Sequence, residues 1–130
     1  MDSVFTKIIN GEIPGNFVWN DEHCVVITTI QPLRKGHLLV IPKVQIDHWD
    51  DLTDDIAAHL MLVAKKITKA IKKVYPCTRV GLIIAGLEVP HTHLHLIPVD
   101  SMSDFDFSQA AFAPAEELQQ VAKAIKAALI

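Results

Sequence analysis

The sequence predicts an α+β fold in which a mainly antiparallel sheet of about five strands carries one long central helix and a C-terminal helix. Three observations indicate this fold: a long amphipathic pattern in the middle of the chain, short β-branched runs on both sides of it, and a second amphipathic pattern near the C-terminus. The length of 130 residues fits a single domain spanning residues 1–130.

The N-terminal part of the chain predicts a short helix followed by three strands. The helix is expected over residues 3–10, because Asn10-Gly11 is a helix-ending pair and Pro14 blocks continuation. The three strands are runs of apolar or β-branched residues bounded by turn residues: Phe17–Asn20, Cys24–Ile30 and His37–Lys43. The third run is almost continuously apolar, which is typical of a central strand buried on both faces.

The clearest element is a helix over Asp54–Tyr75, with apolar residues at steps of three and four: Ile56, Leu60, Val63, Ile67, Ile71 and Val74. Thr53 is a suitable N-cap, and Pro76 prevents continuation. Two further strands, joined by a turn around Gly86, are expected at Arg79–Ala85 and His91–Val99. Pro114 opens a final helix with an apolar face formed by Leu118, Val121, Ala122, Ile125 and Leu129.

Composition excludes several classes of partner. The formal net charge is -3 and no long Lys/Arg run occurs, so we expect no nucleic-acid partner. The N-terminus lacks the basic-then-apolar order of a signal peptide, and no apolar stretch approaches bilayer length, so we expect a soluble cytoplasmic protein with no membrane contact. Cys24 and Cys77 are interpreted as reduced thiols, with a disulfide between them as the alternative.

Three of the seven histidines fall within five residues, in the run His91-Thr92-His93-Leu94-His95. Because a strand turns successive side chains to opposite faces, the three imidazoles are expected to share one face. Burying three adjacent imidazoles is costly unless each has a hydrogen-bond partner, so a purely structural role is disfavoured.

Nucleophilic catalysis on phosphorus is the preferred interpretation of this run. Neutral imidazole is abundant near pH 7 and can attack a phosphoryl group through one nitrogen, and water can then hydrolyse the reactive phosphoimidazole. The nucleophile needs an acceptor on its other nitrogen, which a backbone carbonyl could provide. The competing interpretation is a catalytic zinc site, but alternate strand residues lie about 6.5–7 Å apart, too far for the first and third histidines to reach one ion easily.

At these residues the chain resembles the histidine-triad (HIT) superfamily, whose signature is His-φ-His-φ-His-φ-φ, with Thr92 at an apolar position. The N-terminal segment Val4–Pro14, the central strand Gly36–Lys43 and the turn Gly86–Pro90 are also similar to that family. The resemblance runs from about residue 4 to 98 and is strongest to the Hint-like nucleotide-binding branch.

The resemblance implies hydrolysis or transfer of a nucleoside monophosphate through a covalent nucleotidyl-histidine on His93. By position, His95 and His37 would contact the phosphate or leaving group, and His91 would orient the site. A purine nucleotide or phosphoramidate would bind against residues implied to form the base pocket, ribose site and phosphate turn: Phe5, Ile8, Ile27, Thr29, Ile30, Gly86, Glu88 and Val89. The resemblance implies no cofactor, and it implies a homodimer, for which Met61 and Leu62 offer extra apolar positions on the long helix.

The chain departs from the family pattern at several positions. Thr29 stands where the family usually has an acid that grips the ribose hydroxyls, Leu87 stands where Gln is common, and the loop before Gly86 is shortened. Some relatives hold structural zinc through an N-terminal Cys-x-x-Cys and a His after the Pro-Lys pair. Here the N-terminus has no Cys and Gln45 occupies the His position, so no structural zinc is expected.

Three hypotheses therefore stand: a metal-independent hydrolase acting on a phosphoramidate or phosphoanhydride, a catalytically weak nucleotide- or phosphate-binding module, and a zinc-dependent hydrolase. The segment Asp104–Phe107 is left with two interpretations, a lid or a piece packed on the sheet edge.

Overall fold

The computed structural model describes residues 1–129, and its centre is a five-stranded sheet in the order β1-β2-β3-β5-β4. Every neighbouring pair is antiparallel. The strands are β1 Phe17–Asn20, β2 Cys24–Thr28, β3 Leu38–Pro42, β4 Arg79–Ile83 and β5 Leu94–Val99. The predicted α+β class and the predicted number of strands are confirmed.

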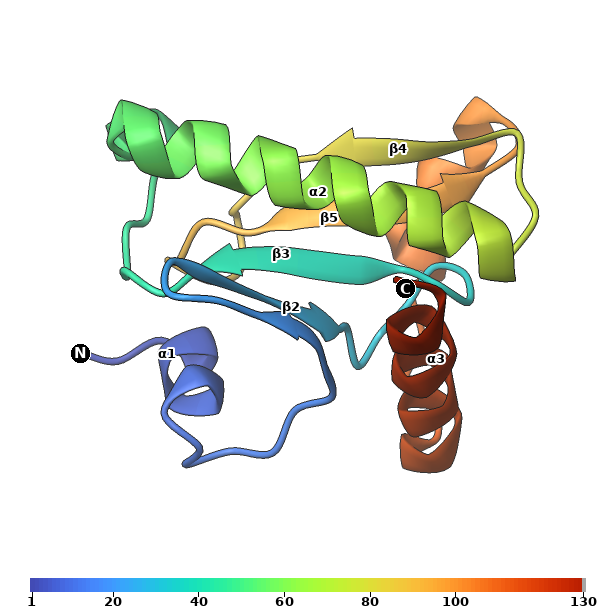
Figure 1. Cartoon of the computed structure of the whole chain (residues 1–130), viewed down its shortest axis with the longest axis horizontal. Helices are drawn as coiled ribbons and strands as arrows, with labels where there is room; N and C mark the ends of the chain where they lie inside the picture. The colour runs from blue at the N-terminus through green and yellow to red at the C-terminus, as the bar shows by residue number, and fades with distance from the viewer. Residues whose placement is uncertain (130) are drawn as a thin grey trace.

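Helices cover both faces of this sheet. The α-helices are α1 Val4–Ile9, α2 Asp54–Val74 and α3 Ala115–Ala128, and the short 3-10 helices are η1 Trp49–Asp51, η2 Met102–Phe105 and η3 Phe107–Gln109. The long helix α2 lies along one face and α1 lies beneath the other, while α3 stands at the end of the sheet where α2 terminates (Figure 1). The predicted N-cap of α2 is confirmed, because the Thr53 hydroxyl accepts the Ile56 N–H at 3.3 Å.

The alternation of side chains along β3 and β5 divides the interior into two cores. Leu38, Val40, Leu94 and Leu96 point to the α2 side and join the larger core, which α3 also covers. On the opposite side Phe5 of α1 packs with four buried strand residues, Val25, Ile27, Leu39 and Ile41. His95 pairs with Leu39 across the ladder, and therefore lies on the α1 side of the sheet.

The expected strand His91–Val99 is wrong at its start, because β5 begins only at Leu94. Pro42 has no N–H to continue the ladder from β3, and its carbonyl accepts the Nε2–H of His91 instead. Thr92 turns away as well, since its N–H donates to the Ile46 carbonyl at 2.7 Å. The first two histidines of the run therefore occupy an irregular segment, and strand alternation does not place them.

Smaller differences concern the other strand ends and the cysteines. The runs expected to reach Ile30 and Ala85 end at Thr28 and Ile83, each just before residues that line the site. Cys24 and Cys77 are both free, as the interpretation as reduced thiols requires. None of the helices in the described chain is long and apolar enough to cross a membrane.

Candidate active site

His93 presents an unprotonated nitrogen to the site. Its Nδ1 lies 2.7 Å from the backbone carbonyl of His91, which can only accept, so the ring proton resides on Nδ1 and the lone pair on Nε2. The side chain is buried, and burial lowers its pKa from the ordinary value, which keeps the imidazole neutral near pH 7. Phe5 holds the ring edge-on, with 4.8 Å between ring centroids. This is the arrangement that a nucleophilic imidazole requires.

His95 has the opposite tautomer, and His37 determines it. The backbone N–H of Leu33 donates to His37 Nδ1 at 3.0 Å, so neutral His37 carries its proton on Nε2. That proton is donated to His95 Nδ1, 2.9 Å away, which leaves the His95 proton on Nε2. Burial, with the neighbouring His95 as a lesser cause, lowers the pKa of His37 to about 3. Burial, with His93 as a lesser cause, lowers the pKa of His95 to about 4. Both rings are therefore neutral at pH 7, and His95 is a hydrogen-bond donor toward the site.

The structure places His37 behind His95, between that ring and the Leu33 backbone. Both of its ring nitrogens are engaged within the protein, and it is only 2% exposed. With both nitrogens occupied in this way, His37 can influence the site through the orientation and tautomer of His95, and a direct contact with substrate stays a prediction.

His91 is fully buried and does not face the site. Its Nε2–H donates to the Pro42 carbonyl at 2.8 Å, so its Nδ1 is an acceptor, and the Ser3 hydroxyl lies 2.7 Å from that nitrogen. With the ring fixed at both nitrogens, the His91 carbonyl is held where it accepts the hydrogen bond from His93 Nδ1–H. The geometry agrees with the orienting role expected for His91.

The partners of His91 were missed by sequence reasoning. Ser3 caps α1 by accepting the Thr6 N–H at 3.1 Å, and its own N–H donates to Gln45 Oε1 at 2.7 Å. The Thr6 hydroxyl donates to the same oxygen at 2.6 Å. Ser3 and Thr6 have the spacing of a Cys-x-x-Cys pair, and together with Gln45 and His91 they form a network of hydrogen bonds. Polar side chains thus fill the position that the resemblance assigns to zinc in some relatives.

Within residues 1–129, three side chains that could act as metal ligands lie close together on the α2 side of the sheet: Asp21, Cys24 and His59. Asp21 Oδ2 already accepts from Trp19 Nε1 and lies 2.7 Å from His59 Nε2. Burial raises the pKa of the Cys24 thiol to about 12, so it is protonated at neutral pH. Hydrogen bonds to Asp21 explain why these three side chains lie together, and no metal ion is needed to explain it.

Two cavities of about 230 Å³ each meet at His93 and His95. The first, the α1 cavity, is lined by seven of the residues expected at the nucleotide: Phe5, Ile8, Ile27, Thr29, Ile30, Glu88 and Val89. The second, the Phe107 cavity, is lined by Ala85, Gly86, Leu87, Glu88, His93, His95 and Phe107. Gly86, expected with the first group, lines the second cavity instead, in a left-handed turn with φ +73.

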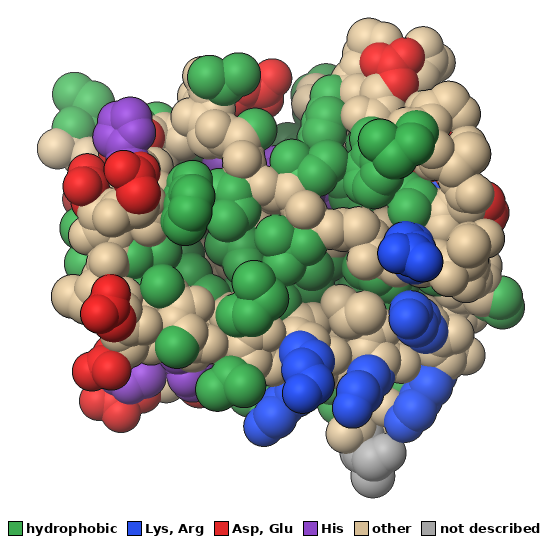
Figure 2. Space-filling model, turned by 90° about the horizontal axis from the view of Figure 1, so that it is seen from above, with side chains coloured by type: hydrophobic (Ala, Val, Ile, Leu, Met, Phe, Trp, Pro, Cys, Tyr) green, Lys and Arg blue, Asp and Glu red, His purple; other side chains and the backbone are tan. Residues whose placement is uncertain are grey.

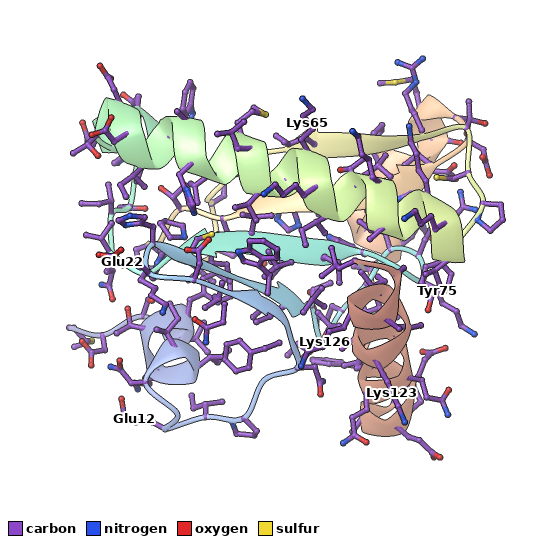
Figure 3. The ribbon with its side chains drawn as sticks, in the orientation of Figure 1. Glu12, Glu22, Lys65, Tyr75, Lys123 and Lys126 are labelled. Atoms are coloured by element: carbon purple, nitrogen blue, oxygen red, sulfur yellow. The ribbon has the colours of Figure 1, made fainter. Side chains whose placement is uncertain are left out.

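Neither cavity wall contains Lys or Arg. Lys65 on α2 and Lys123 and Lys126 on α3 lie on the outer surface of those helices (Figure 3). A phosphate bound between the cavities would therefore meet imidazoles and backbone groups, and the exposed Glu88 carboxylate is the formally charged side chain among the lining residues.

The segment Asp104–Phe107, for which the sequence left two interpretations, contributes Phe107 to the wall of the second cavity. Its ring meets the His95 ring edge-on, with centroids 5.1 Å apart, and approaches His37 at 6.4 Å. Arg34 anchors the preceding turn through Asp104 at 3.0 Å and Asp100 at 3.2 Å. The segment is thus packed against the sheet and walls the site.

A family model described as the HIT domain matches residues 10–102. The chain belongs to the HIT family. An uncharacterized HIT-like protein of Methanocaldococcus jannaschii is 39% identical over 99 residues, covering 73% of this chain and 77% of that protein. Adenosine 5'-monophosphoramidase HNT1 of Saccharomyces cerevisiae is 36% identical over 96 residues, covering 73% of this chain and 61% of that enzyme. Adenylylsulfatase HINT3 of Arabidopsis thaliana is 33% identical over 102 residues, covering 75% and 52%.

Two solved HIT structures match nearly the whole chain. A HIT-like protein from Bartonella henselae superposes with a TM-score of 0.87 at 29% identity, covering 98% of this chain and 96% of that one. A Zn-bound histidine triad family protein from Mycobacterium smegmatis gives 0.82 at 26% identity, covering 99% and 94%. The match to the HIT domain model ends at residue 102, so Phe107 and α3 lie beyond it.

Proposed function

We propose that this HIT protein is a metal-independent hydrolase that cleaves a nucleoside monophosphate from its leaving group through a nucleotidyl intermediate on His93. The observation that carries the proposal is the pair of opposite tautomers at the site. The His91 carbonyl fixes an acceptor nitrogen on His93, and the Leu33 N–H, acting through His37, fixes a donor nitrogen on His95, at the junction of the two cavities. Relatives whose names state hydrolysis of an adenosine phosphoramidate or an adenylyl sulfate support the same class of reaction.

The proposed reaction has two steps, each a displacement at phosphorus. The His93 Nε2 lone pair forms a bond to phosphorus, and the bond from phosphorus to the leaving nitrogen breaks, its electron pair staying on nitrogen, which takes one proton from water. Water then attacks the phosphorus, the Nε2–P bond returns its electrons to the imidazole, and one proton is released. Throughout, the Nδ1–H of His93 donates to the His91 carbonyl, which stabilises the cationic phosphoimidazole, while His95 Nε2–H can donate to the phosphoryl oxygens.

The nucleoside occupies the α1 cavity in this proposal. Phe5 and Ile27 line the cavity with apolar side chains that a purine could contact, and the exposed Ile30 forms the outer wall. Thr29 lies at this cavity, but its hydroxyl already accepts the Gln31 N–H at 3.3 Å and is neutral. We infer weaker ribose binding than a carboxylate would give.

The two alternatives from the sequence have separate tests. A binding module without turnover would bind AMP yet leave adenosine 5'-phosphoramidate intact, which phosphorus NMR detects directly. A zinc-dependent hydrolase would lose activity in EDTA and contain stoichiometric zinc. We expect turnover that persists in EDTA, because both ring nitrogens of the buried His91 are hydrogen-bonded within the protein, so the three histidines of the run do not converge on one ion.

We also propose a homodimer in the cytoplasm. Figure 2 looks down on α2 and β4 and shows hydrophobic side chains gathered in the middle of that face. Met61 and Leu62 of α2 are 55% and 59% exposed, and Leu82 of the edge strand β4 is 37% exposed. An apolar patch beside an unpaired strand edge favours association of two copies. Light scattering at micromolar concentration should give twice the chain mass; a monomer would contradict the proposal.

A further inference from the structure

We infer that Asp21, Cys24 and His59 form a binding site for one zinc ion, on the face of the sheet opposite the active site. The bound ion joins the turn between β1 and β2 to the helix α2 and braces the fold there. This site is separate from the N-terminal position at which some relatives hold structural zinc, where the sequence predicts none. It is also independent of the proposed hydrolase activity.

The three side chains place their ligand atoms at nearly the spacing that zinc requires. The carboxylate oxygen, the sulfur and the ring nitrogen all lie within 4.8 Å of one another. Around a tetrahedral zinc ion with bonds of about 2.0–2.3 Å, such atoms lie about 3.3–3.8 Å apart. Cys24 Sγ is 3.7 Å from Asp21 Oδ2, which is already within this range. His59 Nε2 is 2.7 Å from the same oxygen and has to move outward by about 0.5 Å.

The types of ligand select zinc among the common divalent cations. A thiolate, an imidazole and a carboxylate suit zinc, whereas magnesium and calcium prefer oxygen ligands throughout. On binding, the Cys24 thiol releases its proton to solvent, and the proton on His59 Nε2 moves to Nδ1, which frees the Nε2 lone pair for the metal. The Asp21 and His59 side chains are 24% and 31% exposed, so the ion can enter from that side and a water can become the fourth ligand.

The hydrogen bonds that gather these side chains without a metal also orient them for one. Trp19 Nε1 donates to Asp21 Oδ2 at 2.7 Å, and the backbone N–H groups of His23 and Cys24 each donate to Oδ1 at 2.8 Å. Donors of this kind fix the direction of a metal-binding carboxylate. The surrounding charge favours a cation as well, because Asp, Glu and His side chains gather at the end of this face where α2 begins, and Lys side chains lie toward the other end (Figure 2).

Titration of the full chain with cobalt chloride, followed by absorption spectroscopy, tests the site. We expect one cobalt ion per chain, with the visible bands of a tetrahedral ion and the near-ultraviolet band of a thiolate–cobalt bond, and one equivalent of zinc should remove both. Cys24→Ser should abolish the thiolate band, and His59→Gln should weaken cobalt binding at least about tenfold. Cys77→Ser is the matched control, since it removes the other free cysteine, and should leave the spectrum unchanged.

A stability measurement supplies a second readout. Zinc should raise the urea midpoint of the wild type but not that of His59→Gln, because the three ligands come together only in the folded chain. His59 is partly exposed on α2, so this comparison holds even if Cys24→Ser does not fold.

Removal of zinc with EDTA should leave hydrolysis of a phosphoramidate unchanged, since the site and His95 lie on opposite faces of the sheet. If EDTA abolished hydrolysis while the cobalt spectrum and the zinc-dependent midpoint were as expected, the proposed function would fail and the zinc site would stand. A cobalt complex without a thiolate band, or one equally tight in the wild type and His59→Gln, would overturn the inference.

Discussion

Removing the Ser3 hydroxyl should destabilise the protein by more than the loss of a helix cap. In Ser3→Ala the Thr6 N–H loses its N-cap acceptor, which costs typically about 1 kcal/mol. The fully buried His91 Nδ1 also loses the partner now 2.7 Å away, and an unsatisfied buried acceptor costs about 1–3 kcal/mol. The expected loss in the free energy of unfolding is therefore about 2–4 kcal/mol.

Thr53→Ala provides the matched control. Thr53 caps α2 by the same type of bond, to the Ile56 N–H, but it is exposed and its hydroxyl has no second role in the described chain. Its loss should cost about 1 kcal/mol. Urea unfolding of both variants, followed by far-UV circular dichroism, measures the difference. A Ser3→Ala cost no larger than that of Thr53→Ala would refute the argument that Ser3 holds the His91 ring.

Three further predictions follow from the site. His93→Ala should abolish turnover while His91→Ala retains part of it, because a nucleophile has no substitute whereas an orienting group supplies only part of the barrier reduction; steady-state kinetics with a phosphoramidate checks both. Thr29→Asp should tighten AMP roughly five- to thirtyfold, selectively over deoxy-AMP, since a carboxylate accepts charge-assisted bonds from both ribose hydroxyls; equal calorimetric affinities for both nucleotides in both proteins would show that Thr29 does not meet the ribose. Stability should fall by about 2 kcal/mol from pH 7 to pH 5 through His37 alone. Its pKa is lowered from 6.5 to about 3, so the unfolded chain binds the proton first, and the stability present above pH 6.5 is lost as pH falls toward 3. Urea midpoints of wild type and His37→Gln across this range test the slope, which should be shallower in the variant.

The sequence predicts most helices and strands of the fold well, because these elements depend on local patterns of residues. The apolar repeat of α2, its Thr53 cap and the Pro114 start of α3 are properties of short windows, and the structure confirms them. The boundary of β5 is different, because whether His91 and Thr92 join the ladder depends on Pro42 and Ile46. A tertiary hydrogen bond overrides strand propensity there.

The site shows the same division between local and distant information. The cluster of histidines is visible in the sequence, and the resemblance assigns them roles. Their tautomers depend on partners outside the run: the Pro42 carbonyl, 49 positions away, for His91, and His37, 58 positions away, for His95. Phe107 comes from beyond the part of the chain that matches the HIT domain model, and the sequence left its segment Asp104–Phe107 with two interpretations, a lid or a piece packed on the sheet edge.

The stereochemical course at phosphorus tests the covalent intermediate most directly. A phosphoramidate of AMP made chiral at phosphorus with sulfur is hydrolysed in oxygen-18 water, and the configuration of the product is determined by phosphorus NMR. Attack by His93 followed by attack by water is two in-line displacements, each of which inverts the centre, so the account predicts net retention. Net inversion would mean that water attacks the substrate directly, and that His93 is not the nucleophile.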